Sequence, residues 1–166
     1  MPDPSRHAST AQYLWNLQQV KGEKWMEFVR GLAKQKPMLL ESYSTVPNAI
    51  VRGEAHLGIS YIQYTAQTKG PIGFASIEHV FADPSDAALS AKALNPNAAK
   101  LFIEYLCSGE GQKKVAETHE FVLSPGVFPA IKGADRIVAN LQLLEDPSAE
   151  QLQKLQAEFR QLFVAK

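Results

Sequence analysis

Segments with helical periodicity alternate with short apolar segments along this chain, and that alternation restricts the fold more than any other feature. Apolar residues spaced three to four apart indicate helices, whereas short apolar runs between turn residues are typical of strands. Helices that alternate with strands indicate an α/β domain. The predicted helices cover residues 9–22, 23–35, 44–53, 95–106, 108–117 and 146–166. The predicted strands cover residues 38–43, 56–62, 72–80 and 87–91.

Local signals mark the ends of several of these helices. Ser9 and Gln12 form a capping-box pattern, and Asn95 precedes Pro96, a proline that suits a first helical turn. Gly22 favours an end to the first helix. The helix after Pro96 is expected to bury one face, with Cys107 beside that face as a small apolar residue. The residues of that face are Ala98, Leu101, Phe102, Tyr105 and Leu106.

Charge and composition exclude several classes of function. Lys plus Arg number 17 and Asp plus Glu also number 17, so no basic excess favours nucleic acid or an anionic membrane. With 45% hydrophobic residues the chain has enough apolar side chain to form a core. Its apolar runs are far shorter than the ~20 residues of a membrane span. Residues 1–7 lack a charged segment followed by an apolar one, so we expect no secretory signal there.

Catalytic signatures are not found in the sequence. No G-x-S-x-G, H-E-x-x-H, C-x-x-C or phosphate-loop pattern occurs. Cys107 is the one cysteine, which excludes an internal disulfide framework. The histidines do not have metal-ligand spacing; they are His7, His56, His79 and His119. We therefore expect a protein that is not an enzyme and has no resident cofactor.

Two predicted helix starts carry residues that suit an anion. Exposed amide N–H groups and the helix dipole favour negative charge at a helix N-terminus. Ligands also gather at the carboxyl ends of strands in α/β units. The alternative is that Ser9 and Thr45 only cap their helices. The candidates at the first start are Ser5, Arg6, His7, Ser9 and Thr10, and those at the second are Ser44 and Thr45.

Tyr61 and Tyr64 follow the strand predicted over residues 56–62 and are further candidates. Phenolate oxygens are hard donors that could hold ferric iron, and neutral phenols could stack on or hydrogen-bond an organic ligand. The alternative is that both tyrosines are half-buried packing residues whose hydroxyls reach water.

Residues 95–112, NPNAAKLFIEYLCSGEGQ, resemble a signature of bacterial extracellular solute-binding proteins, in the group that binds ferric iron and small organic anions. Residues 52–59, RGEAHLGI, are similar to a second segment of that family. Asp3-Pro4-Ser5 and Thr10-Ala11 resemble the strand-to-helix junction of its second lobe. Similar residues continue to the end of the chain, at Pro129, Lys132-Gly133 and Glu158-Phe159-Arg160.

The resemblance implies a periplasmic-binding-protein type II-like lobe, an α/β domain with a mixed sheet flanked by helices and a helical C-terminal portion. Such proteins trap a ligand between two lobes and deliver it to the membrane permease of an ABC-type importer, in the periplasm or outside the cell. It further implies that residues 1–90 form the core of the second lobe, 91–145 a helical segment that returns to the first lobe, and 146–166 a C-terminal helix.

Two departures from the family pattern affect the expected ligand. Most of the first lobe is not represented in the sequence, so a single wall of the binding cleft is expected. Iron-binding members carry adjacent tyrosines where this chain has Gln63 and Tyr64. A small phosphorylated or carboxylated anion is therefore favoured over ferric iron, with Tyr64 as the one matching phenol.

Two other classes of function remain open from the sequence. One is an interaction module that forms a homodimer or pairs with a separate N-terminal lobe, because a missing lobe would expose apolar surface. The other is the effector-sensing domain of a transcription regulator, which shares the fold but requires an attached DNA-binding segment.

Overall fold

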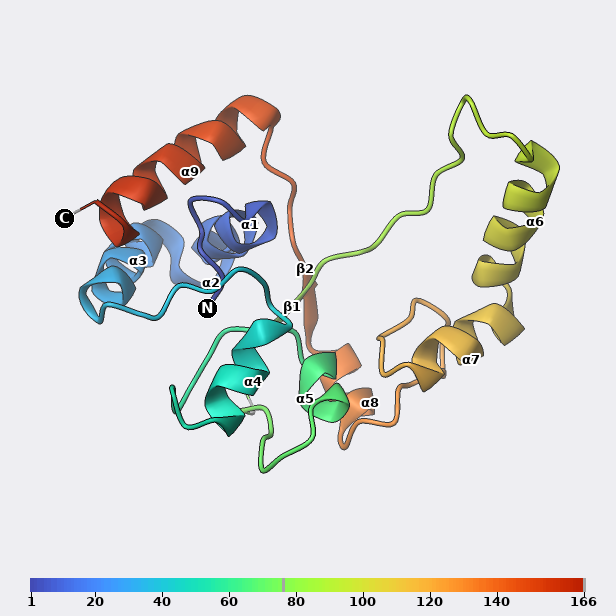
Figure 1. Ribbon diagram of the computed structural model, residues 1–166, viewed down its shortest axis with the longest axis horizontal. Coiled ribbons are helices and arrows are strands. Elements are labelled where there is room, and N and C mark those ends of the chain that lie inside the picture. The colour runs from blue at the N-terminus through green and yellow to red at the C-terminus, as the bar shows by residue number, and fades with distance from the viewer. Residues whose placement is uncertain (76, 166) are drawn as a thin grey trace. The chain divides into compact units, whose positions relative to one another are not determined.

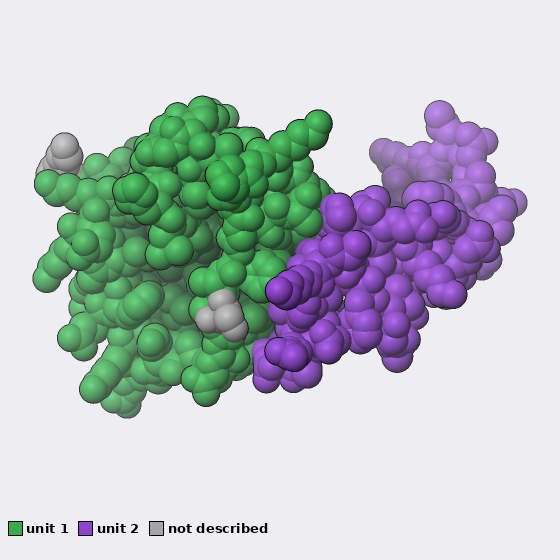
Figure 2. All heavy atoms as spheres, turned by 90° about the horizontal axis from the view of Figure 1, so that it is seen from below, with its two compact units in different colours: residues 1–82, 142–166 green, residues 83–141 purple. Residues whose placement is uncertain are grey.

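The computed structural model describes residues 1–75 and 77–165 and divides them into two compact units. Unit 1 comprises residues 1–82 and 142–166, and unit 2 comprises residues 83–141 (Figure 2). Unit 1 is therefore built from two stretches of chain that are distant in sequence.

Unit 1 is largely helical. Its elements are α1 (Ala8–Asn16), α2 (Gln18–Lys21), the 3-10 helix η1 (Gly22–Lys24), α3 (Trp25–Lys34), α4 (Thr45–Val51), α5 (Gln63–Gln67), β1 (Val80–Ala82), most of β2 (Leu141–Leu143) and α9 (Ala149–Phe163). β1 and β2 form a two-stranded parallel sheet. The C-terminal helix α9 lies across α1 and α3 (Figure 1).

The core of unit 1 forms where α9 meets the N-terminal helices. Leu14 of α1, Val29 of α3 and Phe159 of α9 have no exposed surface, and Leu155 is also buried. These positions come from the apolar stripes that predicted the helices, so the periodicity of the sequence and the observed packing agree. Burying a side chain of this size contributes about 1.5–3 kcal/mol.

Hydrogen bonds of Asn16 connect α1 to the segment that precedes α9. Asn16 is fully buried, and its amide donates to the carbonyl oxygens of Gln12 at 2.9 Å and Glu145 at 3.0 Å. Its own carbonyl oxygen accepts from the backbone N–H of Glu145 at 2.8 Å. The Gln12 amide also donates to the Asp146 carboxylate at 2.8 Å. α9 itself begins at the N-cap Ser148, whose hydroxyl accepts from the N–H of Gln151.

Unit 2 contains three helices within its described residues, α6 (Pro96–Cys107), α7 (Gly109–Glu117) and α8 (Ala134–Ala139). Ser108 caps α7 and receives the N–H of Gly111 at 3.1 Å. A Cβ atom at Gly111 would lie 1.9 Å from the carbonyl oxygen of Tyr105, so only glycine permits this junction between α6 and α7. Residues 121–131 are extended and rich in turns, as the sequence predicts.

The strand predictions are mostly wrong. The segments 38–43, 56–62 and 87–91 form no named strand, and Val80 is the one residue of the segment 72–80 assigned to β1. Ser76, within that segment, and Lys166, at the end of the last predicted helix, lie outside the described residues. The 38–43 segment forms only an isolated parallel bridge, between Leu40 and Pro2. A strand requires a paired neighbour, and local sequence does not supply one.

Three further expectations about helices require correction. α1 begins at Ala8 with His7 as N-cap and no side-chain capping bond, so Ser9 is not a cap. No residue of α6 is buried, and its predicted buried face is mostly exposed. Cys107, at the end of α6, is exposed as well. A stripe at helical spacing identifies a face that can be buried, but burial also requires an element that covers it.

Candidate functional site

The turn that leads into α1 is organised by Asp3. Its carboxylate accepts from the N–H of Ser5 at 2.8 Å and from the Ser5 hydroxyl at 2.7 Å. The carbonyl oxygen of Asp3 accepts from the N–H groups of Arg6 and His7. Arg6 lies 3.8 Å from the Asp3 carboxylate, with 86% of its side chain exposed. The Asp-Pro-Ser sequence thus forms a closed turn that leaves the Arg6 guanidinium in solvent.

The N-terminus of α1 has amide donors that its own side chains do not satisfy. His7, the N-cap residue, makes no side-chain capping bond, and the first turn contains no acidic residue. The first N–H groups of any α-helix have no acceptor within the helix. The partial positive charge there therefore remains available to an anion.

Two buried polar atoms at this helix start have no hydrogen-bond partner. They are Nδ1 of His7 and Oγ1 of Thr10. Thr10 is fully buried and occupies the third position of α1, where side chains lean toward the N-terminus of a helix. A buried hydroxyl without a partner costs about 1–3 kcal/mol, so such groups usually have a partner in the functional state.

An aromatic cluster, defined as His7, Tyr43, Tyr61 and Tyr64, adjoins the same helix start. The rings of His7 and Tyr43 meet edge to face with centroids 5.2 Å apart. Tyr43 and Tyr61 follow at 4.5 Å, and Tyr61 and Tyr64 at 6.0 Å. The Ser60 hydroxyl donates to the Tyr43 carbonyl oxygen at 2.8 Å and joins two of the three segments involved. Tyr43 is buried, whereas Tyr61 and Tyr64 are half-buried.

The start of α4 is arranged differently. The Thr45 hydroxyl donates to the carbonyl oxygen of Ser42 at 2.7 Å, and the hydroxyls of Ser42 and Ser44 are 2.9 Å apart. α4 has no side-chain capping bond, so neither Ser44 nor Thr45 caps it as one interpretation predicted. Ser44 remains exposed. The hydroxyl hydrogen of Thr45 is engaged within the chain, which makes this start a weaker donor than that of α1.

The structure thus brings His7, Tyr61 and Tyr64 together through Tyr43, a residue that the sequence did not identify as a candidate. Ser44 and Thr45 follow Tyr43 directly in the chain. Ser5 is engaged by Asp3, and Ser9 lies half-buried within α1. Tyr43 was missed because it belonged to the segment predicted as a strand. Its position between two serines, directly before a helix start, was the available signal.

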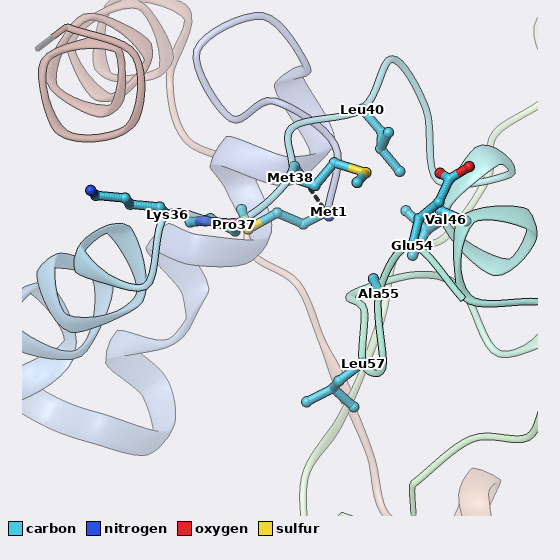
Figure 3. Close-up of a pocket in the computed structure, with 10 residues that line it drawn as sticks. Met1, Lys36, Pro37, Met38, Leu40, Val46, Glu54, Ala55 and Leu57 are labelled. Atoms are coloured by element: carbon cyan, nitrogen blue, oxygen red, sulfur yellow. Dashed lines mark hydrogen bonds between the residues drawn. The ribbon is translucent and has the colours of Figure 1, made fainter. Parts of the chain in front are cut away.

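A separate pocket of about 400 Å³ lies elsewhere in unit 1 (Figure 3). Its lining is mainly apolar and comes from the segments 36–40, 46–49 and 54–57 together with Met1. None of the nine candidate residues lines it. Burial lowers the pKa of the Met1 amino group, which donates to the Met38 carbonyl oxygen at 3.1 Å.

The acidic residue at this pocket is already paired. Glu54 receives two bonds from the Arg52 guanidinium, at 2.6 and 3.0 Å. The bonds from Arg52 lower the pKa of the Glu54 carboxyl, and Glu54 in turn raises the pKa of Arg52. The carboxylate of this pocket is therefore engaged within the chain, and none of the candidate residues lines the pocket, so the start of α1 is the better candidate site.

Among the residues that the structure describes, no group of three or more His, Cys, Asp or Glu side chains is placed to hold a metal ion. The described helices also include none with the length and apolar character needed to cross a bilayer.

A family model for the bacterial extracellular solute-binding protein matches residues 1–119 of this chain. The matched region contains the turn at Asp3, the start of α1 and the whole aromatic cluster. No curated protein and no solved structure matches the chain.

Proposed function

Because the chain belongs to the bacterial extracellular solute-binding protein family, we propose that it captures a small organic or phosphorylated anion for import by an ABC-type transporter. The site is the N-terminus of α1 together with the aromatic cluster. The protein acts as a binding component and not as an enzyme. Its ligand passes to the membrane permease of the importer, in the periplasm or at the outer face of the cell.

The observation that carries this proposal is the pair of unpartnered polar atoms at the start of α1. Thr10 Oγ1 and His7 Nδ1 are buried without a hydrogen-bond partner, and they lie at a helix start that has no side-chain cap. A phosphate or carboxylate oxygen placed there would accept from the Thr10 hydroxyl and from the first amides of α1. One ligand would then satisfy several groups that the chain alone leaves unsatisfied.

Arg6 supplies charge to this site at a distance from the buried atoms. Its guanidinium is mostly exposed and lies near the Asp3 carboxylate, so an incoming anion competes with Asp3 for it. An exposed ion pair contributes at most about 1 kcal/mol, and such competition is therefore feasible. Arg6 acts chiefly by attracting the anion, and the amides and Thr10 hold it.

The half-buried rings of Tyr61 and Tyr64 form the side of the site that faces the organic part of the ligand. Their faces offer apolar contact and their hydroxyls offer hydrogen bonds. Ferric iron is the second ligand that these phenols accommodate, since phenolate oxygen is a hard donor. In a two-lobed binding protein this lobe forms one wall of a cleft, and closure against a second lobe supplies the rest of the contact surface.

Thr10→Val tests the site, because the substitution replaces a buried hydroxyl by a methyl group of similar size. Isothermal titration calorimetry with inorganic phosphate is expected to show at least about a tenfold loss of affinity, as for a lost bond to a charged group. The unliganded variant is expected to be more stable than the wild type by about 1 kcal/mol, because an unsatisfied group has been removed.

Ser9→Ala is the matched control in the same helix turn, and it should leave phosphate affinity unchanged. A Thr10→Val protein that gains stability and still binds phosphate as the wild type does would show that Thr10 is a buried residue without a ligand role. Titration with ferric iron separates the second candidate, because a tyrosinate complex absorbs visible light and Tyr64→Phe should remove that band.

A further inference from the structure

We propose that His7 makes anion capture by unit 1 depend on pH, because its protonated imidazole donates a hydrogen bond from Nδ1 to the bound anion. This inference rests on the proposed function and names the regulation of the same site. His7 is the N-cap residue of α1, and its Nδ1 atom is buried without a hydrogen-bond partner. An anion held at the start of α1 would supply the acceptor that a protonated Nδ1 requires.

The contact of the His7 ring with Tyr43 fixes where Nδ1 lies. The two rings meet edge to face with centroids 5.2 Å apart, and Tyr43 is buried. Nδ1 is bonded to Cγ, so it stands where the side-chain oxygen of a capping Asp or Asn stands. Such an oxygen reaches the N–H groups of the first helical turn. Nδ1 makes no capping bond in α1, so an anion at this helix start can approach both the first turn and the imidazole.

A second buried atom points to a ligand at the same helix start. Thr10 is fully buried, and its hydroxyl oxygen also has no partner. The backbone N–H of Thr10 donates to the His7 carbonyl oxygen at 3.1 Å, so a single turn of helix carries both unpartnered atoms. Buried polar groups usually have partners, and two exceptions in one turn indicate a shared ligand.

The ionisable groups around His7 leave it as the group that changes charge near neutral pH. In the turn before α1, the Asp3 carboxylate lies 3.8 Å from the Arg6 guanidinium. Glu41, the nearest acidic residue on the segment of Tyr43, is exposed. Carboxyl groups ordinarily titrate below about pH 5, and phenols such as those of the aromatic cluster titrate near pH 10. Imidazole gains its proton between about pH 8 and pH 5.

Protonation changes what His7 offers to an anion. The neutral ring carries one N–H group and donates from Nδ1 in only one of its tautomers, whereas the imidazolium donates from both nitrogens and adds a positive charge. A hydrogen bond from a charged donor to an anion is about twice as strong as a neutral one. The bound anion therefore favours the protonated ring, and binding takes up a proton from solvent. It follows that affinity rises as the pH falls through the histidine range and is lost as the pH rises.

Isothermal titration calorimetry with sulfate, at about pH 5.5 and about pH 8 and at one ionic strength, tests the proposal. Sulfate is the probe because its own charge does not change over this range. The wild type is expected to bind it at least about tenfold more tightly at the lower pH. His7→Gln should bind equally at both values, with the affinity of the wild type at the higher pH. His7→Phe keeps a ring against Tyr43 and lacks the nitrogen, so it serves if His7→Gln does not fold.

His119→Asn is the matched control, since His119 of unit 2 also has a buried Nδ1 without a partner. Its φ of 71° suits asparagine, so the variant should fold and keep the wild-type pH dependence. Equal sulfate affinity at both pH values would overturn this inference and leave the anion site standing. So would a pH dependence that persists without His7. If sulfate does not bind at either pH the inference is also wrong, and the phosphate titration of Thr10→Val then decides the proposed function separately.

Discussion

α9 in unit 1 and α6 in unit 2 are both amphipathic helices, yet they bury very different amounts of side chain. α9 buries Leu155 and Phe159 against α1 and α3, whereas α6 buries no residue. Both apolar stripes repeat every three to four residues, so helical periodicity alone does not explain the difference. It comes from whether the chain supplies a surface to cover the stripe. Amphipathicity in this molecule therefore identifies a core in one unit and an exposed apolar helix face in the other.

The largest expected effect contrasts one phenylalanine from each unit. Phe159→Ala should lower the free energy of unfolding of unit 1 by about 3–5 kcal/mol, because it leaves a cavity in a core with no exposed surface. Phe102→Ala should change the free energy of unfolding of unit 2 by less than about 0.5 kcal/mol, because Phe102 is 60% exposed. Urea titration followed by far-ultraviolet circular dichroism reports the helices of both units. Equal losses in the two variants would show that unit 2 buries Phe102 after all.

Two asparagines, one in each unit, allow the same comparison of buried and exposed positions for polar side chains. Asn16→Ala should destabilise unit 1 by about 2–3 kcal/mol, because the backbone N–H of Glu145 would lose its acceptor and the Glu145 carbonyl oxygen would keep only the 3.3 Å bond from Gln12. Asn140→Ala removes one exposed bond, from its amide to the Arg136 carbonyl oxygen, and should change stability by less than about 0.5 kcal/mol. Thermal unfolding by differential scanning calorimetry reports both variants. A mild Asn16→Ala phenotype would mean that water replaces these bonds.

One residue after α3, in unit 1, and one after α7, in unit 2, have a left-handed backbone conformation. A glycine substitution at each is expected to be stabilising, which allows the two units to be compared. Lys36 follows α3 with a φ of 50°, and His119 follows α7 with a φ of 71°. Glycine is preferred at such positions because other residues are strained there. Lys36→Gly and His119→Gly should each add about 0.5–1 kcal/mol to the stability of the adjoining helix, measured by amide hydrogen exchange. Lys34→Gly, inside α3, is the control and should destabilise by about 1 kcal/mol.

The smallest effect is a difference in pH dependence between two exposed ion pairs. Arg52 lowers the pKa of Glu54, so the Glu54 contribution is present above the ordinary value of 4.5 and is lost as the pH falls below it. Glu117 raises the pKa of Lys114, so the Lys114 contribution is present below the ordinary value of 10.5 and is lost as the pH rises above it. Melting temperatures of Glu54→Gln and Lys114→Gln should therefore approach the wild type at acid and at alkaline pH respectively. The opposite pattern would contradict both assignments.

The longer helices could be predicted from this sequence because their signals are local, whereas the short helices α5 and α8 were not predicted. Ser148 caps α9, Ser108 caps α7 and Pro96 opens α6, all within one turn of the residues they affect. Strands could not be predicted in the same way, since a segment such as 38–43 becomes a strand only when a neighbour pairs with it. Leu40 shows the limit, because its one bridge joins it to Pro2 and extends no further.

The candidate site was predictable in its composition but not in its arrangement. His7, Tyr61 and Tyr64 were recognisable as polar or aromatic residues beside predicted helix starts. Their meeting depends on Tyr43, which comes from a third segment and contacts both His7 and Tyr61. The sequence also could not predict that Thr10 Oγ1 has no hydrogen-bond partner, because burial and hydrogen bonding are properties of the folded chain.

The discontinuity of unit 1 also determines when the protein can fold during synthesis. Its core requires Leu14 and Phe159, so the N-terminal helices leave the ribosome long before α9 exists to cover them. Unit 2 is translated in the interval, between Ala82 and Leu144, whose backbone groups later bond to each other at 2.9 Å. During that interval the apolar side chains of α1 and α3 are open to chaperones and to other nascent chains. Stable folding of unit 1 therefore requires that α9 has been synthesised.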